Sequence, residues 1–142
     1  MEQADVVILG GAVVGTSVAW HLLCRLKQKA RVVVIEKDFS YARAQTALSL
    51  TSIRQQFSCA ANIRASLYGL SFIREAPRNL GIDLGFHENG YLFLATEAGA
   101  AVLAENHAMQ VAAGGDILLL DPAGLAERFP WLSTEDVACG TW

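Results

Sequence analysis

A glycine-rich turn near the start of the chain is the first feature whose residue types and spacing predict chemistry. Gly10-Gly11-Ala12-Val13-Val14-Gly15 occupies the frame of the phosphate-binding turn G-x-G-x-x-G, with Ala12 at the second glycine position. Gly10 allows the tight turn, and Gly15 allows a helix to pack closely against a strand. Backbone N–H groups and the dipole of the following helix can then stabilise a pyrophosphate. The Ala12 methyl group weakens such binding by about 1 kcal/mol, the size of a small misfit in a packed site.

A carboxylate follows this turn at the spacing that a dinucleotide site requires. Glu36 lies 21 residues beyond Gly15, where its oxygens can accept hydrogen bonds from the 2′ and 3′ hydroxyls of a ribose. A 2′-phosphate would be repelled there, so NADP is disfavoured. Taken singly, the turn is also compatible with an ordinary strand-to-helix connection. Glu36 by itself is also compatible with a solvated acid at the end of a strand. The two together favour a dinucleotide site.

Two apolar runs and a helical segment must position these residues. Residues 5–9 and 31–36 are typical of buried parallel strands, and the spacing after Gly15 predicts a helix between them, which makes a βαβ unit. No Asp, Glu, Lys or Arg occurs from Val6 to Cys24, a run long enough to span a membrane. Glycines and His21 inside the run favour strand, turn and helix instead, so we expect no transmembrane segment.

The rest of the chain predicts helices and strands that follow a long polar loop at residues 37–57. We expect Ser58 to cap a helix that Pro77 kinks or ends and that Gly81 closes. Further strands are expected at 90–95, 117–120 and 137–142, and further helices from Thr96 to Gly114 and from Asp121 to Pro130. Only two strands fit the βαβ pattern, so the sequence looks like the N-terminal portion of a longer protein.

Composition restricts the remaining classes of function. The chain has 142 residues, of which 53% are hydrophobic and 18% charged, so it should fold, and its net charge of -3 without a basic stripe disfavours nucleic acid. Its three cysteines form no C-x-x-C pair and its histidines share no ligand spacing, so neither a disulfide framework nor a metal site is expected. The first strand begins almost at Met1, which leaves no room for a presequence and predicts a cytoplasmic location.

Five segments of the chain carry a family resemblance. They are DVVILGGAVVGTSVAWHL, VVVIEKD, AQTALSLTSIRQQFS, GYLFLA and RFPWLSTEDVA. With them the chain resembles the FAD-dependent oxidoreductases of the D-amino-acid oxidase type, which include glycine oxidase, sarcosine oxidase and dimethylglycine dehydrogenase. The third segment is the specific one, because nicotinamide enzymes lack it. The resemblance implies an α/β fold with a Rossmann-like FAD-binding βαβ unit, followed by part of an α+β substrate domain that is apparently truncated. Residues 1–80 would be the N-terminal part of the FAD-binding domain, and residues 81–142 the start of the substrate domain.

The resemblance also implies roles for individual residues. The FAD pyrophosphate would be bound by Gly10, Gly11, Ala12, Val14 and Gly15, the adenosine ribose by Glu36 and Lys37, and the phosphate and ribityl chain by Thr46, Ala47 and Ser49. Relatives continue with Gly-Gly-Ile-Arg beside the flavin ring, and here Thr51 and Ser52 replace the two glycines. Arg54 matches the arginine, which would stabilise negative charge on the reduced ring or attract a substrate carboxylate. The alternative for Arg54 is an ordinary surface arginine.

The implied activity is the oxidation of a small amine or amino acid by hydride transfer to flavin, with oxygen or a carrier as the final electron acceptor. Unpaired sheet edges also predict self-association of the chain. Two alternatives stay open. One is a truncated, catalytically inactive fragment that binds nucleotide, and the other is a nicotinamide-binding domain, against which the loop at residues 44–57 argues.

Overall fold

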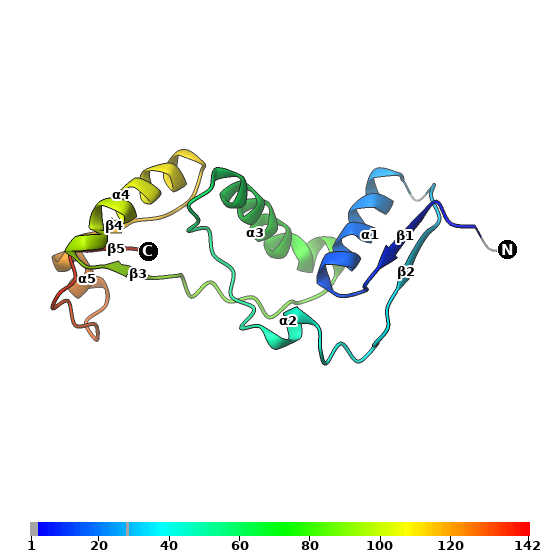
Figure 1. The fold of residues 1–142 in the computed structure, drawn as a ribbon, viewed down its shortest axis with the longest axis horizontal. Helices are drawn as coiled ribbons and strands as arrows, with labels where there is room; N and C mark the ends of the chain where they lie inside the picture. The colour runs from blue at the N-terminus through cyan, green and yellow to red at the C-terminus, as the bar shows by residue number, and fades with distance from the viewer. Residues whose placement is uncertain (1–2, 28) are drawn as a thin grey trace. The chain divides into compact units, whose positions relative to one another are not determined.

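The fold is described for residues 3–27 and 29–142 from a computed structural model (Figure 1), so Met1, Glu2 and Gln28 lie outside the described residues. The chain divides into two compact units, Met1–Ser52 and Ile53–Trp142. The first unit is a βαβ arrangement, and the second combines helices with an antiparallel sheet. This confirms the predicted α/β class. The predicted boundary between an FAD-binding domain at 1–80 and a substrate domain at 81–142 differs from the boundary between these two units. The assignment of the two domains stays a prediction.

The first unit contains the predicted parallel strand pair and its crossover helix. Strand β1 (Val6–Leu9) pairs in parallel with β2 (Val32–Ile35), and helix α1 (Val13–Arg25) connects them. The Gly10 N–H extends the ladder by donating to the Ile35 carbonyl oxygen at 2.8 Å. The short helix α2 (Gln45–Leu48) lies in the long polar segment that follows β2. The glycine turn therefore begins where β1 leaves the sheet.

The prediction that both strands are fully buried is wrong. A Cβ atom on Gly15 of α1 would lie 3.3 Å from Ile8 Cγ2, so Ile8 faces the helix. Side chains alternate across a strand, and its neighbours Val7 and Leu9 are 53% and 81% exposed. A parallel strand is buried on both faces only where layers cover both sides of the sheet, and within this unit α1 covers one side.

The second unit is a three-stranded antiparallel sheet with helices around it. Its helices are α3 (Ala60–Leu80), α4 (Glu97–Ala112) and α5 (Pro122–Arg128), and its strands are β3 (Phe93–Ala95), β4 (Leu119–Leu120) and β5 (Cys139–Thr141). The strand order is β3-β5-β4, which places the last strand of the chain at the centre of the sheet. The buried apolar core comprises Ile63, Ala76, Ile117, Leu125 and Phe129.

The predicted ends of α3 need two corrections. The residue that precedes the helix is Cys59, without a side-chain capping bond, so the prediction that Ser58 caps the helix is wrong. Pro77 does not end the helix, because it lies three residues before Leu80 and removes only one hydrogen bond near the end. Gly81 closes the helix as predicted, with a left-handed φ of 68° and its N–H on the Pro77 carbonyl oxygen at 3.1 Å.

The other predicted helix starts agree with the structure in position. Thr96 precedes α4, although its side chain makes no capping bond. Asp121 caps α5, because its Oδ1 accepts the Gly124 N–H at 2.8 Å and Pro122 occupies the first turn. These starts depend on residues within one helical turn, which is why the sequence predicts them.

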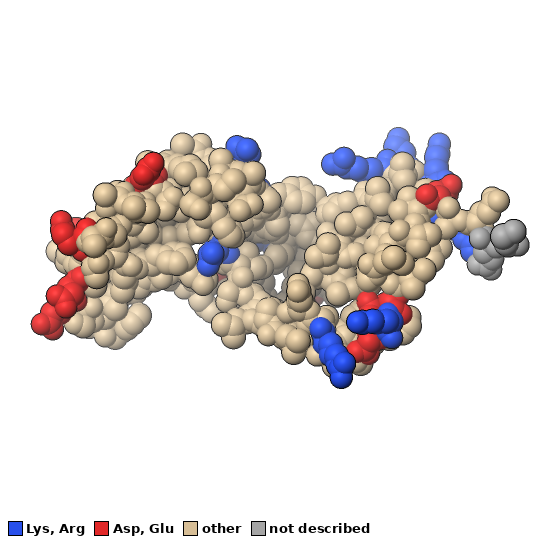
Figure 2. Space-filling view, viewed as in Figure 1, with Lys and Arg blue, Asp and Glu red and all other residues tan. Residues whose placement is uncertain are grey.

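The surface combines small charged groups with a large uncharged area. Figure 2 shows mostly uncharged side chains on the face in view, with acidic and basic side chains lying next to each other in some places. No helix within residues 3–27 and 29–142 has both the length and the apolar character needed to cross a membrane.

Candidate functional site

The glycine turn between β1 and α1 has a geometry that two of its residues satisfy only as glycine. Gly10 has a φ of +102°, in the region that side chains disfavour. A Cβ atom on Gly15 would lie 1.8 Å from the Gly10 carbonyl oxygen, which is far inside any non-bonded contact. Gly15 therefore lets the first turn of α1 close against the end of β1.

The first turn of α1 leaves backbone donors available. Ala12 precedes the helix with φ -71° and ψ -174° and makes no side-chain capping bond, and the first turn contains no acidic residue. The first N–H groups of a helix have no partner inside it and carry a partial positive charge. The turn can therefore accept a phosphate group without a competing carboxylate. Ala12 is unstrained, so an alanine fits the backbone here.

Glu36 is fixed directly beside the turn. Its Oε2 accepts the Gly11 N–H at 2.6 Å, and its Oε1 accepts the Asp38 N–H at 2.9 Å. The Gly11 N–H, followed by the Asp38 N–H, holds the pKa of Glu36 below its ordinary value of 4.5, so the side chain is a carboxylate at neutral pH. Each carboxylate oxygen can accept a further hydrogen bond, so Glu36 can also receive hydroxyl groups. The bond to Gly11, which ties the turn to β2, was missed by sequence reasoning.

Tyr41 is a second residue that sequence reasoning missed at this site. A Cβ atom on Gly11 would lie 3.1 Å from Glu36 Cβ and 3.4 Å from the Tyr41 hydroxyl oxygen, and Gly11 is buried. Glu36 and Tyr41 thus border the turn from the β2 side. The signal available in the sequence is the position of Tyr41 in the polar segment directly after β2.

The predicted ribityl-binding residues lie on α2 and at its end. Thr46 and Ala47 are inside α2, and the Ser49 hydroxyl donates to the Thr46 carbonyl oxygen at 2.9 Å and accepts the Thr51 N–H at 3.1 Å. Thr51 has a φ of +50°, a left-handed conformation that strains a β-branched residue and suits glycine. Thr51 stands at a position for which the family resemblance implies glycine.

Arg54 lies in the second unit, among aromatic rings. Its guanidinium carbon is 4.9 Å from the ring centroid of Phe57, 5.5 Å from that of Phe93 and 5.6 Å from that of Tyr91. Its Nε is buried and has no hydrogen-bond partner among the residues that the structure describes. Aromatic faces attract the cation without satisfying its donors. Arg54 is therefore partly enclosed, unlike an ordinary surface arginine, and it keeps its positive charge beside the three rings.

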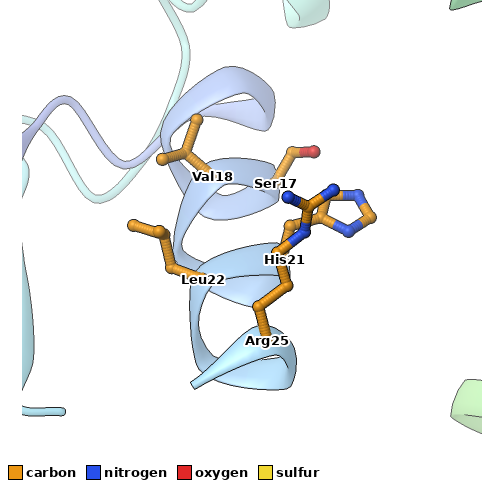
Figure 3. A pocket seen from close by; sticks show the side chains of 5 residues that line it. All are labelled: Ser17, Val18, His21, Leu22 and Arg25. Carbon is orange, nitrogen blue, oxygen red and sulfur yellow. The ribbon is translucent and has the colours of Figure 1, made fainter. Parts of the chain in front are cut away.

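A hollow elsewhere on the first unit follows one side of α1. Figure 3 shows its lining, which consists of Ser17, Val18, His21, Leu22 and Arg25. It shares no residue with the glycine turn. Over the described part of the chain, no group of three or more His, Cys, Asp or Glu side chains could hold a metal ion.

Comparisons with known proteins identify the family. A family model described as FAD dependent oxidoreductase (DAO) matches residues 5–142. FAD-dependent oxidoreductase domain-containing protein 1 of Bos taurus is 44% identical, and the match covers 99% of this chain and 31% of that protein. L-proline dehydrogenase from P. horikoshii superposes with a TM-score of 0.81 at 30% identity, covering 99% of this chain and 36% of that chain. Glycine oxidase from Geobacillus kaustophilus shares the fold, with a TM-score of 0.74 at 23% identity, and the match covers 99% of this chain and 39% of that chain.

The chain thus spans about a third of the length of the curated relatives it matches. The comparisons confirm the family resemblance predicted from the five sequence segments, and with it the Rossmann-like FAD-binding fold. The family model extends over nearly the whole chain, from the first strand to the last residue. The chain belongs to the family of FAD-dependent oxidoreductases.

Proposed function

We propose that the protein oxidises an amino acid or a related amine by hydride transfer from the carbon next to nitrogen to FAD. The observation that carries this proposal is Arg54, a half-buried cation held against the rings of Phe57, Tyr91 and Phe93. A guanidinium group of this kind suits the carboxylate of an amino acid. Two structural relatives, named L-proline dehydrogenase and glycine oxidase, have amino acids in their names, which supports the same substrate class.

The residues of the first unit fit the diphosphate and ribose of FAD. The free N–H groups of the α1 turn suit the pyrophosphate, at Gly10, Gly11, Ala12, Val14 and Gly15. Ionised Glu36, with Lys37 beside it, suits the ribose hydroxyls, and Thr46, Ala47 and Ser49 are proposed for the phosphate and ribityl chain. When bound, FAD supplies the acceptor for the hydride. The residues of the chain bind the cofactor and orient the substrate.

A second candidate is a nucleotide-binding protein without catalytic activity. Thr51 favours it, because a strained left-handed threonine stands at a position implied to be glycine beside the flavin. A cytoplasmic location and self-association through the unpaired edges of β1 and β2 also stay predictions.

The absorption spectrum of FAD distinguishes these candidates. The protein is incubated with FAD, desalted and mixed without oxygen with an amino acid, or with the 2-hydroxy acid of the same side chain as a matched control. We expect the amino acid to bleach the flavin band and the hydroxy acid to leave it unchanged. Retained FAD that no amine reduces would support the second candidate, and loss of all FAD on desalting would refute the assignment of the turn.

Removal of the Ala12 methyl group is expected to strengthen cofactor binding. Ala12→Gly should lower the Kd for FAD about fivefold, equivalent to about 1 kcal/mol, because the methyl group lies where the pyrophosphate approaches the backbone. Quenching of flavin fluorescence on titration with protein measures the Kd, and Ala42→Gly at an exposed position of the same unit is the control. An unchanged or weaker affinity of Ala12→Gly would argue against a pyrophosphate over this turn.

Neutralisation of Glu36 is expected to weaken FAD binding and to change the acid stability of the protein. Glu36→Gln should raise the Kd for FAD about tenfold, because charge-assisted bonds to the turn and the ribose are lost. The pKa of Glu36 lies below 4.5 in the folded state, so its carboxylate stabilises the fold above about pH 4.5. That stabilisation is lost as the pH falls through the lowered pKa.

Circular dichroism during acid titration measures this stability difference. The wild-type protein should lose stability more steeply below pH 4.5 than Glu36→Gln does. Glu105→Gln, at an exposed position of α4, should behave like the wild type in both experiments. Parallel acid curves for the wild type and Glu36→Gln would contradict the hydrogen bonds described for this carboxylate.

A further inference from the structure

The backbone around Arg54 is held in place by side chains from distant parts of the second unit. The Ser66 hydroxyl on α3 donates to the Arg54 carbonyl oxygen. Gln110 on α4 donates through Nε2 to the Phe57 carbonyl oxygen at 3.1 Å. Between these two points, Gln56 turns its side chain into the sheet. Residues 54–57 have no regular secondary structure, so these bonds replace the ladder that a helix or strand would provide.

Gln56 makes a buried hydrogen-bonded clamp with Thr141. Its Nε2 donates to the Tyr91 carbonyl oxygen at 2.6 Å and to the Thr141 carbonyl oxygen at 3.4 Å, and its Oε1 accepts the Thr141 hydroxyl. Gln56 is 8% exposed, and Thr141 is fully buried on the central strand β5. Both ends of the amide are therefore satisfied away from water, where an unpaired polar group would be strongly destabilising.

This clamp connects Arg54 to two of the rings around it. Tyr91 supplies one ring and the carbonyl oxygen that Gln56 binds. Phe93 supplies another ring and lies opposite Thr141 in the β3–β5 register. These two rings are stacked, with centroids 5.2 Å apart. Gln56 thus ties the segment that carries the cation to the strands that carry the aromatic faces.

We infer that Gln56 and Thr141 are positioning residues that hold the Arg54 guanidinium in one orientation among Phe57, Tyr91 and Phe93. Without the clamp, the segment can shift relative to the sheet, and the guanidinium leaves the rings. The consequence for substrate binding rests on the proposed function of Arg54. The positioning itself does not, and it can be measured separately.

Nuclear magnetic resonance of arginine Nε–H groups tests the positioning directly in the full chain without added FAD. Ring currents should shift the Arg54 Nε–H signal away from those of exposed arginines, and its disappearance in Arg54→Lys assigns it. We expect Gln56→Met and Thr141→Val each to move the chemical shift of the Arg54 Nε–H signal toward that of exposed arginines. Gln45→Met, the same substitution at an exposed position of α2, should leave the signal in place.

The conservative variant Gln56→Glu tests whether protonation restores the position of the Arg54 signal. In Gln56→Glu, a protonated carboxyl group can still donate to the Tyr91 carbonyl oxygen and accept the Thr141 hydroxyl, whereas an ionised one cannot donate. The Arg54 signal should therefore return to its wild-type position at low pH and move away as the pH rises. A pH-independent signal in this variant would contradict the donor role of Gln56.

Steady-state kinetics test whether the clamp affects substrate binding. Gln56→Met should raise the KM for the amino acid about tenfold with a smaller change in kcat, and the FAD content should stay unchanged. A signal that stays in place in folded Gln56→Met and Thr141→Val would overturn the inference. A signal that moves as expected, together with a normal KM in Arg54→Met, would support the clamp and refute the proposed role of Arg54 instead.

Discussion

Gly15→Ala is expected to abolish the retention of FAD. The added Cβ atom would lie 1.8 Å from the Gly10 carbonyl oxygen, which is a backbone atom and cannot turn aside as a flexible side chain can. The helix α1 must therefore move away from β1, and the N–H groups of its first turn move with it. A hydrogen bond to a charged phosphate contributes about 1.5–3 kcal/mol, so displacement of these donors should raise the Kd for FAD about 100-fold.

The FAD content after desalting and a titration of flavin fluorescence measure this effect. Gly69→Ala in the middle of α3 is the matched control, because its Cβ atom would have no atom within 4 Å and alanine favours a helix by about 1 kcal/mol. That variant should retain FAD and have an equal or higher Tm. Wild-type FAD affinity in Gly15→Ala would mean that the pyrophosphate does not bind over this turn.

Arg54→Met is expected to lower kcat/KM for an amino acid about 100-fold, because a hydrogen bond to a charged group contributes about 1.5–3 kcal/mol. Methionine keeps much of the arginine stem and packs well against Phe57, Tyr91 and Phe93, so the fold and the FAD content should be preserved. Only the charge and its donors are lost. Turnover followed through flavin reduction measures the effect.

Two controls separate substrate binding from folding. The first is Arg64→Met at an exposed position of α3, which should keep wild-type kinetics. The second is a matched pair of substrates, an amino acid and the amine that lacks its carboxylate. Arg54→Met should affect the amino acid far more than the amine. An equal loss for both substrates would indicate that Arg54 interacts with the flavin ring or stabilises the fold, and that it does not bind the substrate carboxylate.

The candidate site divides into residues that local patterns predict and residues that they do not. Gly10 and Gly15 are predicted from the sequence because their requirements arise inside one strand, turn and helix. Gln56 and Tyr41 carry no such local pattern. Gln56 lies 85 residues from Thr141 in the chain, and one sequence contains no periodicity that relates positions so far apart.

The errors in the sequence analysis have the same origin. The strands β1 and β2 are apolar enough to be buried, but burial depends on what packs on each face of the sheet, and Leu9 is 81% exposed. Ser58 is a good capping residue, but the helix starts one residue later than that role requires. In both cases the residue type permits a structure that the surrounding chain does not form.

The sequence by itself determined the βαβ unit and the glycine turn, because steric requirements over a few residues and the motif spacing specify them. The cofactor class and the family followed from the resemblance of its five segments to known flavoenzymes. Only the tertiary structure decided the bond from the Gly11 N–H to Glu36, the aromatic surroundings of Arg54 and the clamp of Gln56 on Thr141. These interactions join residues from separate elements. Their partners are selected by how those elements pack in three dimensions, and this information is not contained in any local stretch of the chain.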